Sequence, residues 1–225
     1  MTGTLVNVVA VLVGSSVGMA IGKRIPEGLK KGIISGLGLA TLLIGIQMAL
    51  KTGNILIPIA SIVLGGLVGE LLQIETFLEQ LAERLRGYSR SGSSTFVTGF
   101  ITASLVFCVG SMTIVGSLQE GINGDSTLLI TKSLMDGTAS IAFASTLGIG
   151  VAFSALTVLI VQGSLTLLGQ NLAFLLSGSL LNEMTAAGGL MIIGIGFLLL
   201  DIKKLKIANF LPALIIAPAL AWLFP

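Results

Sequence analysis

Long apolar runs make up most of the chain, and they restrict its fold more than any other feature. Several of them, such as Thr4–Gly22 and Ile55–Leu72, approach or reach the roughly 20 residues that a helix needs to cross a bilayer core. Charged residues make up only 10% of the chain, against about 25% in an ordinary soluble domain, and 54% of the residues are hydrophobic. A water-soluble globule is therefore excluded, and the predicted fold is all-α, a polytopic bundle of transmembrane helices.

The apolar runs predict eight membrane spans, with ends defined to within several residues. The predicted spans are Thr4–Gly22, Ile33–Leu50, Ile55–Leu72, Phe96–Leu118, Leu128–Ser145, Gly148–Leu168, Thr185–Leu200 and Ile207–Phe224. The fifth span is the most polar, because it carries Lys132 and Asp136 as well as several hydroxyl side chains.

The basic residues predict the orientation of these spans, since Lys and Arg near span ends collect on the cytoplasmic side. If the chain has eight spans, nearly all of its basic residues fall on one side of the membrane, and only Lys51 falls clearly on the other. The residues on the common side are Lys23, Arg24, Lys30, Lys31, Arg84, Arg86, Arg90, Lys203, Lys204 and Lys206. We therefore predict a multi-pass protein of the cell membrane with both termini outside the cytoplasm.

We predict a single integral membrane domain over residues 1–225, in which a surface segment joins two halves. Residues 1–73 form the first half, and residues 96–225 form the second. Between them, residues 74–95 begin with apolar side chains that recur at helical spacing, namely Ile74, Phe77, Leu78, Leu81 and Leu85. This pattern predicts an amphipathic helix at the cytoplasmic surface, followed by a Gly/Ser linker. Its charged face is either solvated or docks a partner protein.

Short matching motifs indicate an inverted repeat. Val13-Gly14-Ser15 matches Val109-Gly110-Ser111, and Leu42–Ile46 matches Met191–Ile195. In the predicted orientation the matched segments run in opposite directions, which is typical of secondary transporters. Chance similarity is the alternative, because the chain is rich in Gly, Leu and Ile. The GxxxG spacing of its glycines predicts close helix packing, either within one bundle or at a homo-oligomer interface.

Several classes of function lack the residues they need. The chain contains no histidine, which removes the commonest general base, the HExxH zinc site and the Ser/His/Asp triad. Its single cysteine, Cys108, cannot form a disulfide or a cysteine metal cluster within one chain. The net charge is only +2, and the basic residues form no stripe interleaved with aromatics, so nucleic acid is not an expected partner. We expect neither an enzyme nor a cofactor, and the presence of a metal stays open.

The candidate functional residues are polar groups within or beside the apolar runs, where charge is costly and usually faces a partner or a water-filled cavity. Lys132 and Asp136 are four residues apart, so they share a helical face and form either a functional pair or a structural ion pair. Upstream, Glu120 and Asp125 belong to the glycine-jointed segment 119–127, predicted to be a turn. Its oxygens could bind a cation, or Asp125 or Ser126 could cap the next helix.

A second polar group stands where the seventh span is predicted to begin, and it contains Asn182 and Glu183. The short run Leu172–Leu181 before it is too brief to cross the membrane and is either re-entrant or interfacial. In the sixth span, Gln162 adds an amide that serves as a pathway residue or as an interhelical hydrogen bond.

The order of these motifs resembles that of a bacterial and archaeal membrane family catalogued as domain of unknown function 554. The segments that carry the resemblance are Gly22–Glu27, Phe107–Met112 with Ile114–Gly116, Gly124-Asp125, Lys132–Gly137, Phe143–Gly150, Gln162–Ser164 and Asn182–Thr185. The resemblance covers almost the whole chain and implies a multi-span inner-membrane protein. It brings no established activity and no catalytic residues.

The function that these features favour is a small secondary transporter or exchanger for a cation or small polar solute. Its pathway residues would be Glu120, Asp125, Lys132, Asp136, Gln162, Asn182 and Glu183. The alternative is a non-transporting membrane scaffold or regulatory partner protein, whose polar groups only hold helices together.

Overall fold

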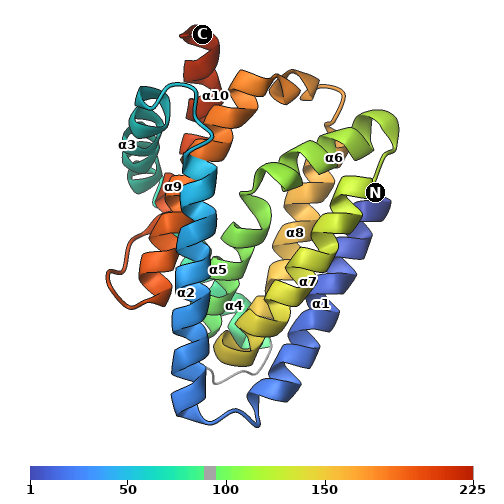
Figure 1. Ribbon diagram of the computed structural model, residues 1–225, viewed down its shortest axis with the longest axis vertical. Coiled ribbons are helices and arrows are strands. Elements are labelled where there is room, and N and C mark those ends of the chain that lie inside the picture. The colour runs from blue at the N-terminus through green and yellow to red at the C-terminus, as the bar shows by residue number, and fades with distance from the viewer. Residues whose placement is uncertain (89–94, 225) are drawn as a thin grey trace. The chain divides into compact units, whose positions relative to one another are not determined.

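The computed structural model describes residues 1–88 and 95–224, and every regular element within these ranges is a helix, as predicted (Figure 1). In chain order they are α1 (Thr2–Gly22), α2 (Glu27–Ala49), α3 (Leu56–Leu71), α4 (Ile74–Tyr88), α5 (Phe96–Cys108), α6 (Ser111–Asn123), α7 (Thr127–Leu147), α8 (Gly150–Leu167), the 3₁₀ helix η1 (Ala173–Leu176), α9 (Gly178–Leu199), the 3₁₀ helix η2 (Ile207–Phe210) and α10 (Ala213–Leu223). Arg90 and most of the predicted linker lie outside the described residues.

Fewer helices qualify as membrane spans than the eight predicted from the sequence, when each helix is judged by its length and apolar composition. Among the described helices, α1, α2, α8 and α9 are long and apolar enough to cross a membrane. The bent pairs α3–α4 and α5–α6 raise the number to six if each pair is one span. The polar helix α7 is not among them, although its 21 residues would extend about 32 Å. The count of eight is therefore not confirmed.

The predicted span Phe96–Leu118 is wrong as a continuous helix. It is broken at Val109 and Gly110, where α5 ends and α6 begins, and the two axes differ by 59°. The reason is local: Gly110 is in an extended conformation, with ψ at 148°, so the helical hydrogen-bond ladder stops there. The break leaves carbonyl groups at the end of α5 without helical partners.

The chain forms two compact units, each described separately, and they are not the two predicted halves. Unit 1 consists of Met1–Ile34 and Glu79–Ala173, and unit 2 consists of Ser35–Leu78 and Phe174–Pro225. Each unit therefore draws on both halves of the sequence. The predicted inverted repeat is not confirmed.

In unit 1, α1 and α7 lie side by side and run in the same direction (Figure 1). Their backbones touch because glycines of α1 lie against α7. A Cβ atom on Gly14 would overlap the carbonyl oxygen of Gly137, and one on Gly18 would overlap that of Ile141. The predicted GxxxG packing thus occurs within one bundle. Helix α5 packs along α8, also in the same direction.

In unit 2, the helices pack as antiparallel neighbours. Gly45 of α2 lies against Gly189 of α9, and Gly38 lies against Gly196, so α2 and α9 run in opposite directions. Helix α3 packs in the same manner against the segment η2–α10. An alanine core of Ala187, Ala213 and Ala217, with Ile62 against it, joins α9, α10 and α3.

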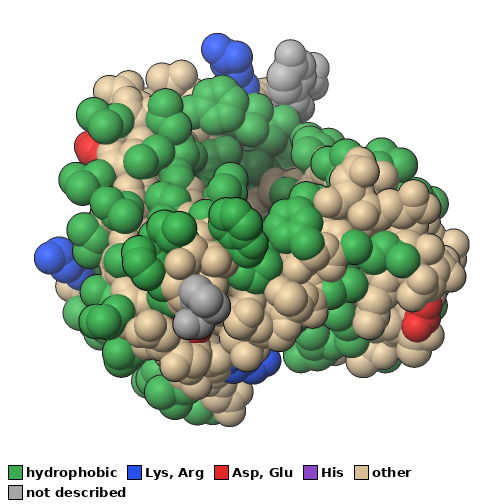
Figure 2. Space-filling view, turned by 90° about the horizontal axis from the view of Figure 1, so that it is seen from above, with side chains coloured by type: hydrophobic (Ala, Val, Ile, Leu, Met, Phe, Trp, Pro, Cys, Tyr) green, Lys and Arg blue, Asp and Glu red, His purple; other side chains and the backbone are tan. Residues whose placement is uncertain are grey.

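The surface of the described chain is strongly apolar, as a lipid-facing exterior requires. Large hydrophobic side chains are widely exposed, including Leu71 at 85%, Trp222 at 78% and Ile215 at 75%. Figure 2 shows one face on which hydrophobic side chains are frequent and charged ones are few. Exposed apolar surface on this scale is not found on soluble monomers, so the helices are those of a membrane protein.

The amphipathic segment is a helix, α4, as predicted, and its first residues are tied to unit 2. The Glu75 backbone donates to Asn209 Oδ1 at 2.7 Å, and the Ala208 backbone donates to Glu75 Oε2 at 2.7 Å. Asn209 also donates to Glu70 Oε2 at 2.6 Å. These bonds fix the turn between α3 and α4 against η2.

Candidate functional site

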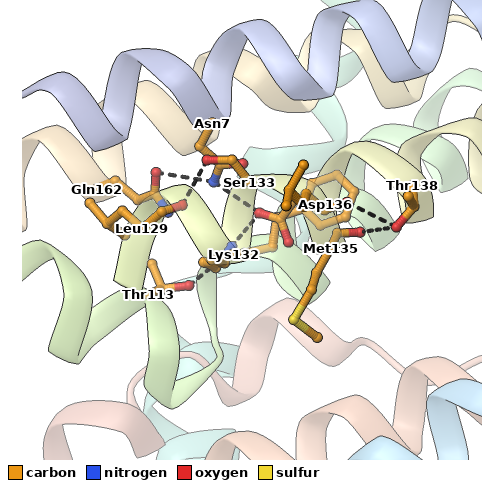
Figure 3. A network of polar contacts seen from close by, with 11 residues as sticks. Asn7, Thr113, Leu129, Lys132, Ser133, Met135, Asp136, Thr138 and Gln162 are labelled. Atoms are coloured by element: carbon orange, nitrogen blue, oxygen red, sulfur yellow. Dashed lines mark hydrogen bonds and ion pairs between the residues drawn. The ribbon is translucent and has the colours of Figure 1, made fainter. Parts of the chain in front are cut away.

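The centre of the candidate site is a buried ion pair on α7. Lys132 and Asp136 lie one helical turn apart, and the Lys132 ammonium bonds to Asp136 Oδ2, as their spacing predicts (Figure 3). The residues are only 5% and 7% exposed. Removing two charges from water is costly, so each charge depends on the other and on further hydrogen bonds.

The broken helix supplies the second contact of Lys132. Its Nζ atom donates to the backbone carbonyl of Phe107 at 2.8 Å. In an unbroken helix this carbonyl would accept the amide of residue 111, but the break at Gly110 frees it. Thr113 Oγ1, on the first turn of α6, donates to the same carbonyl at 2.8 Å. The C-terminal end of a helix carries partial negative charge, so the end of α5 favours the Lys132 ammonium at this position.

Two amide side chains from other helices complete the network. Asn7 of α1 donates to Asp136 Oδ2 at 2.9 Å and to Gln162 Oε1 of α8 at 3.2 Å. Both amides are fully buried, yet Asn7 Oδ1 and Gln162 Nε2 have no hydrogen-bond partner. Unpaired buried polar atoms are rare and costly. The network therefore keeps one acceptor and one donor available.

Other unpaired polar atoms lie in the same unit. Within the described residues, every buried side-chain nitrogen or oxygen found without a partner belongs to unit 1, and besides the two amides these are Ser15 Oγ, Thr102 Oγ1, Ser117 Oγ and Ser140 Oγ. Unit 1 is thus polar inside and incompletely hydrogen-bonded.

The position of the pair along α7 places it deep in the bundle. Asp136 is the tenth residue of this 21-residue helix, so it lies about 14 Å from one end and about 17 Å from the other. A helix of this length that crosses a bilayer would hold Asp136 near the midplane.

Glu120 lies elsewhere than predicted, because α6 continues to Asn123 and the segment 119–123 is helical, not a turn. Glu120 is buried and contacts the first turn of α1. The Gly3 backbone donates to Oε1 at 2.6 Å, Thr4 Oγ1 lies 3.4 Å from Oε2, and the Met1 amino group is 3.3 Å from Oε1. This carboxylate stabilises the positive end of a helix.

Asp125 is exposed and does not join Glu120. Its Oδ1 accepts the backbone amide of Thr127 at 3.0 Å, a contact that supports the start of α7. The hydrogen bond holds the pKa of the Asp125 carboxyl below its usual value. The N-cap residue of α7 is Ser126, which makes no side-chain capping bond, so Asp125 supports the first turn from the position before the cap.

Asn182 and Glu183 lie in unit 2, inside α9, because this helix begins at Gly178 and not at Thr185. Asn182 is exposed, whereas Glu183 is buried. The Glu183 carboxylate accepts three hydrogen bonds from the loop between α2 and α3: from Thr52 Oγ1 at 2.6 Å, from the Gly53 backbone at 2.7 Å and from the Asn54 backbone at 3.2 Å. These bonds give Glu183 a role in holding a loop.

The run Leu172–Leu181, left open as re-entrant or interfacial, contains the short helix η1 and then the first turn of α9. Among the described residues, no group of three or more His, Cys, Asp or Glu side chains is placed to hold a metal ion.

The sequence did not single out Asn7 or the Phe107 carbonyl. Asn7 could have been found, since it is the amide within the first apolar run. The carbonyl could not, because its availability depends on the break between α5 and α6.

Comparison of the sequence with known protein families gives one match over nearly the whole chain. Residues 2–222 match the family model described as "Protein of unknown function (DUF554)". The chain belongs to this family. The finding confirms the resemblance carried by the motifs around Phe107, Lys132 and Asn182, and the match extends over both units.

Two family members show the same extent of similarity. An "Uncharacterized membrane protein YdfK" from Bacillus subtilis is 33% identical over 222 residues, covering 97% of this chain and 94% of that protein. An "Uncharacterized protein YqgA" from Escherichia coli is 32% identical over 227 residues, covering 98% and 97%. No solved structure matches the chain. The name of the first relative and the apolar helices of this chain agree that the chain is a membrane protein.

Proposed function

We propose that the protein is a small secondary transporter or exchanger for a cation or small polar solute, with its central site at Lys132 and Asp136. The observation that carries the proposal is the buried ion pair bonded to the broken end of α5. Intramembrane charges usually mark substrate or ion pathways. Irregular backbone at membrane depth is tolerated where it is buried in protein or lines a cavity, and broken helices form the binding sites of many transporters.

The unpaired amide atoms support the same proposal. A network that served only to hold helices together would be expected to satisfy its own buried groups, because each unsatisfied group costs about 1–3 kcal/mol. Here Asn7 Oδ1 and Gln162 Nε2 remain available beside the ion pair. A bound solute that pairs with them would recover that free energy, which favours a ligand site over the scaffold alternative.

The proposal includes a location in the inner membrane with both termini outside the cytoplasm, and no enzymatic activity or nucleic-acid partner. It is compatible with either a monomer or a homo-oligomer. The distribution of Lys and Arg residues is the basis for this orientation, and the directions of the helices within each unit agree with an alternating order of spans. The parallel pair α1–α7 and the antiparallel pair α2–α9 have the directions that an alternating order of eight spans requires. Reporter fusions at each terminus test this part, since an active cytoplasmic reporter at either end would contradict it.

Ligand-induced stabilisation tests the site. A ligand that binds the native protein raises its melting temperature, so we would screen the detergent-purified protein against inorganic cations, amino acids and organic acids. A selective increase in wild type, lost in Asp136→Asn and kept in the exposed control Glu79→Gln, is expected. An increase that Asp136→Asn retains in full would remove Asp136 from the site. Co-purification of a stoichiometric protein partner, with no response to any compound, would favour the scaffold.

A further inference from the structure

We infer that the ammonium group of Lys132 occupies the position of an alkali cation, and that a monovalent cation such as Na⁺ or K⁺ binds there by displacing it from Asp136 and the Phe107 carbonyl. This inference rests on the proposed function and names the substrate or coupling ion of the same site.

The atoms around Lys132 Nζ are those that an alkali cation uses. Its partners are a carboxylate oxygen of Asp136 and the backbone carbonyl of Phe107, at the C-terminal end of a half-helix. Free backbone carbonyls and the C-terminal ends of half-helices coordinate Na⁺ in transporters, and carbonyl oxygens replace the hydration shell of K⁺ in channels. The two partners therefore form part of a cation site that a tethered ammonium fills.

A further unpaired oxygen belongs to the amide group that donates to Asp136. Asn7 Oδ1 is fully buried and has no hydrogen-bond partner, although the other atom of the same amide group, Nδ2, is bonded to Asp136. An ammonium on a lysine side chain donates hydrogen bonds in fixed directions, whereas a metal cation accepts oxygen ligands from any direction. A cation at this position could use this oxygen once the Asn7 side chain turns its amide so that Oδ1, and not Nδ2, faces Asp136.

The charge balance selects a monovalent ion. Asp136 is the carboxylate that Lys132 contacts, whereas Glu120 is bonded to the first turn of α1. Exchanging the ammonium for a monovalent cation leaves the total charge of the site unchanged when the displaced Lys132 side chain gives up one proton to water and remains as a neutral amine. A divalent cation would leave one uncompensated charge, and the described residues offer no cluster of three acidic or other metal-binding side chains.

Competition predicts that removing the ammonium strengthens cation binding. The apparent dissociation constant equals the intrinsic constant divided by the fraction of molecules in which the site is free. A site that Lys132 fills most of the time therefore binds an external cation weakly. The probes are radioactive Na⁺ and Rb⁺, the latter as a substitute for K⁺, bound to full-length protein in detergent at constant ionic strength with choline chloride. Lys132→Met should bind one of them at least about tenfold more tightly than wild type, and Lys132→Met with Asp136→Asn should lose this binding.

Lys132→Met leaves a buried carboxylate unpaired and can fail to fold, so two further measurements keep the inference testable. Lys132→Gln keeps a neutral hydrogen-bond donor near the same place and should also bind the cation more tightly. In wild type, the nitrogen NMR signal of the Lys132 ammonium should shift on addition of NaCl or KCl but not of choline chloride.

Unchanged cation affinity in the folded Lys132 variants, or an NMR signal that alkali salts do not move, would overturn the inference. The proposed function would survive that result if a neutral solute stabilised wild type but not Asp136→Asn. The two failures are thus distinguishable.

Discussion

The side-chain amide of Asn7 donates a hydrogen bond to Asp136 across 2.9 Å, although 129 residues separate the two in the sequence. This contact joins α1 to α7, and through Lys132 it reaches the broken end of α5. Three helices therefore depend on one buried carboxylate.

The buried pair should be strongly coupled in stability. Lys132→Met or Asp136→Asn alone leaves one buried charge unpaired and should cost about 3–5 kcal/mol, whereas the double variant should cost less than the sum. Unfolding of the detergent-solubilised proteins by sodium dodecyl sulfate measures the four free energies of this cycle. Strictly additive effects would mean that the two charges are already screened by water.

The glycine contacts between α1 and α7 should be sensitive to a single methyl group. Gly14→Ala would push a Cβ atom into the Gly137 carbonyl, so it should lower stability by about 1–3 kcal/mol. Gly32→Ala in α2 is the matched control, because no neighbouring atom lies within 4 Å of the Cβ atom that this change adds. The control should be neutral or more stable by up to about 1 kcal/mol. Equal melting temperatures for the two variants would disprove the close α1–α7 packing.

Glu183 should control the mobility of the loop between α2 and α3. Glu183→Ala removes three hydrogen bonds to residues 52–54, so trypsin should cut after Lys51 about tenfold faster or more. Asn182→Ala, a change at the exposed neighbouring residue, should leave the rate as in wild type. If both variants were cut at the wild-type rate, Glu183 would not be the residue that holds the loop.

Asp125 should contribute a small acid-sensitive stabilisation to the start of α7. Its folded pKa lies below the ordinary value of 3.8, because the Thr127 amide donates to the ionised carboxylate. A lowered folded pKa means that the stabilisation is present above the unfolded pKa and is lost as pH falls through the folded pKa. The melting temperature of wild type should therefore exceed that of Asp125→Asn near pH 6 and approach it below about pH 3. A difference that stays constant over this range would exclude the carboxylate as the cause.

Sequence patterns predicted the helical class, the amphipathic helix and the Lys132–Asp136 pair, because each depends on local composition or on i,i+4 spacing, and the resemblance in the order of motifs indicated the family. They did not predict the break after Cys108, since Val109-Gly110 interrupts an apolar run without changing its hydropathy. They also placed Glu120 and Glu183 outside helices that in fact include them. Glu120 contacts the first turn of α1, and Glu183 contacts the loop after α2. These contacts depend on tertiary packing, which a local sequence pattern cannot predict.

Solute uptake into proteoliposomes is the most direct test of whether the protein transports a solute through a site at Asp136. We would compare wild type, Asp136→Asn and Glu79→Gln for uptake of inorganic cations, amino acids and organic acids, after confirming by melting temperature that each protein is folded. Wild type and Glu79→Gln should take up at least one compound, and Asp136→Asn should take up none. Uptake by Asp136→Asn at the wild-type rate, or no uptake of any compound by folded wild type, would contradict it.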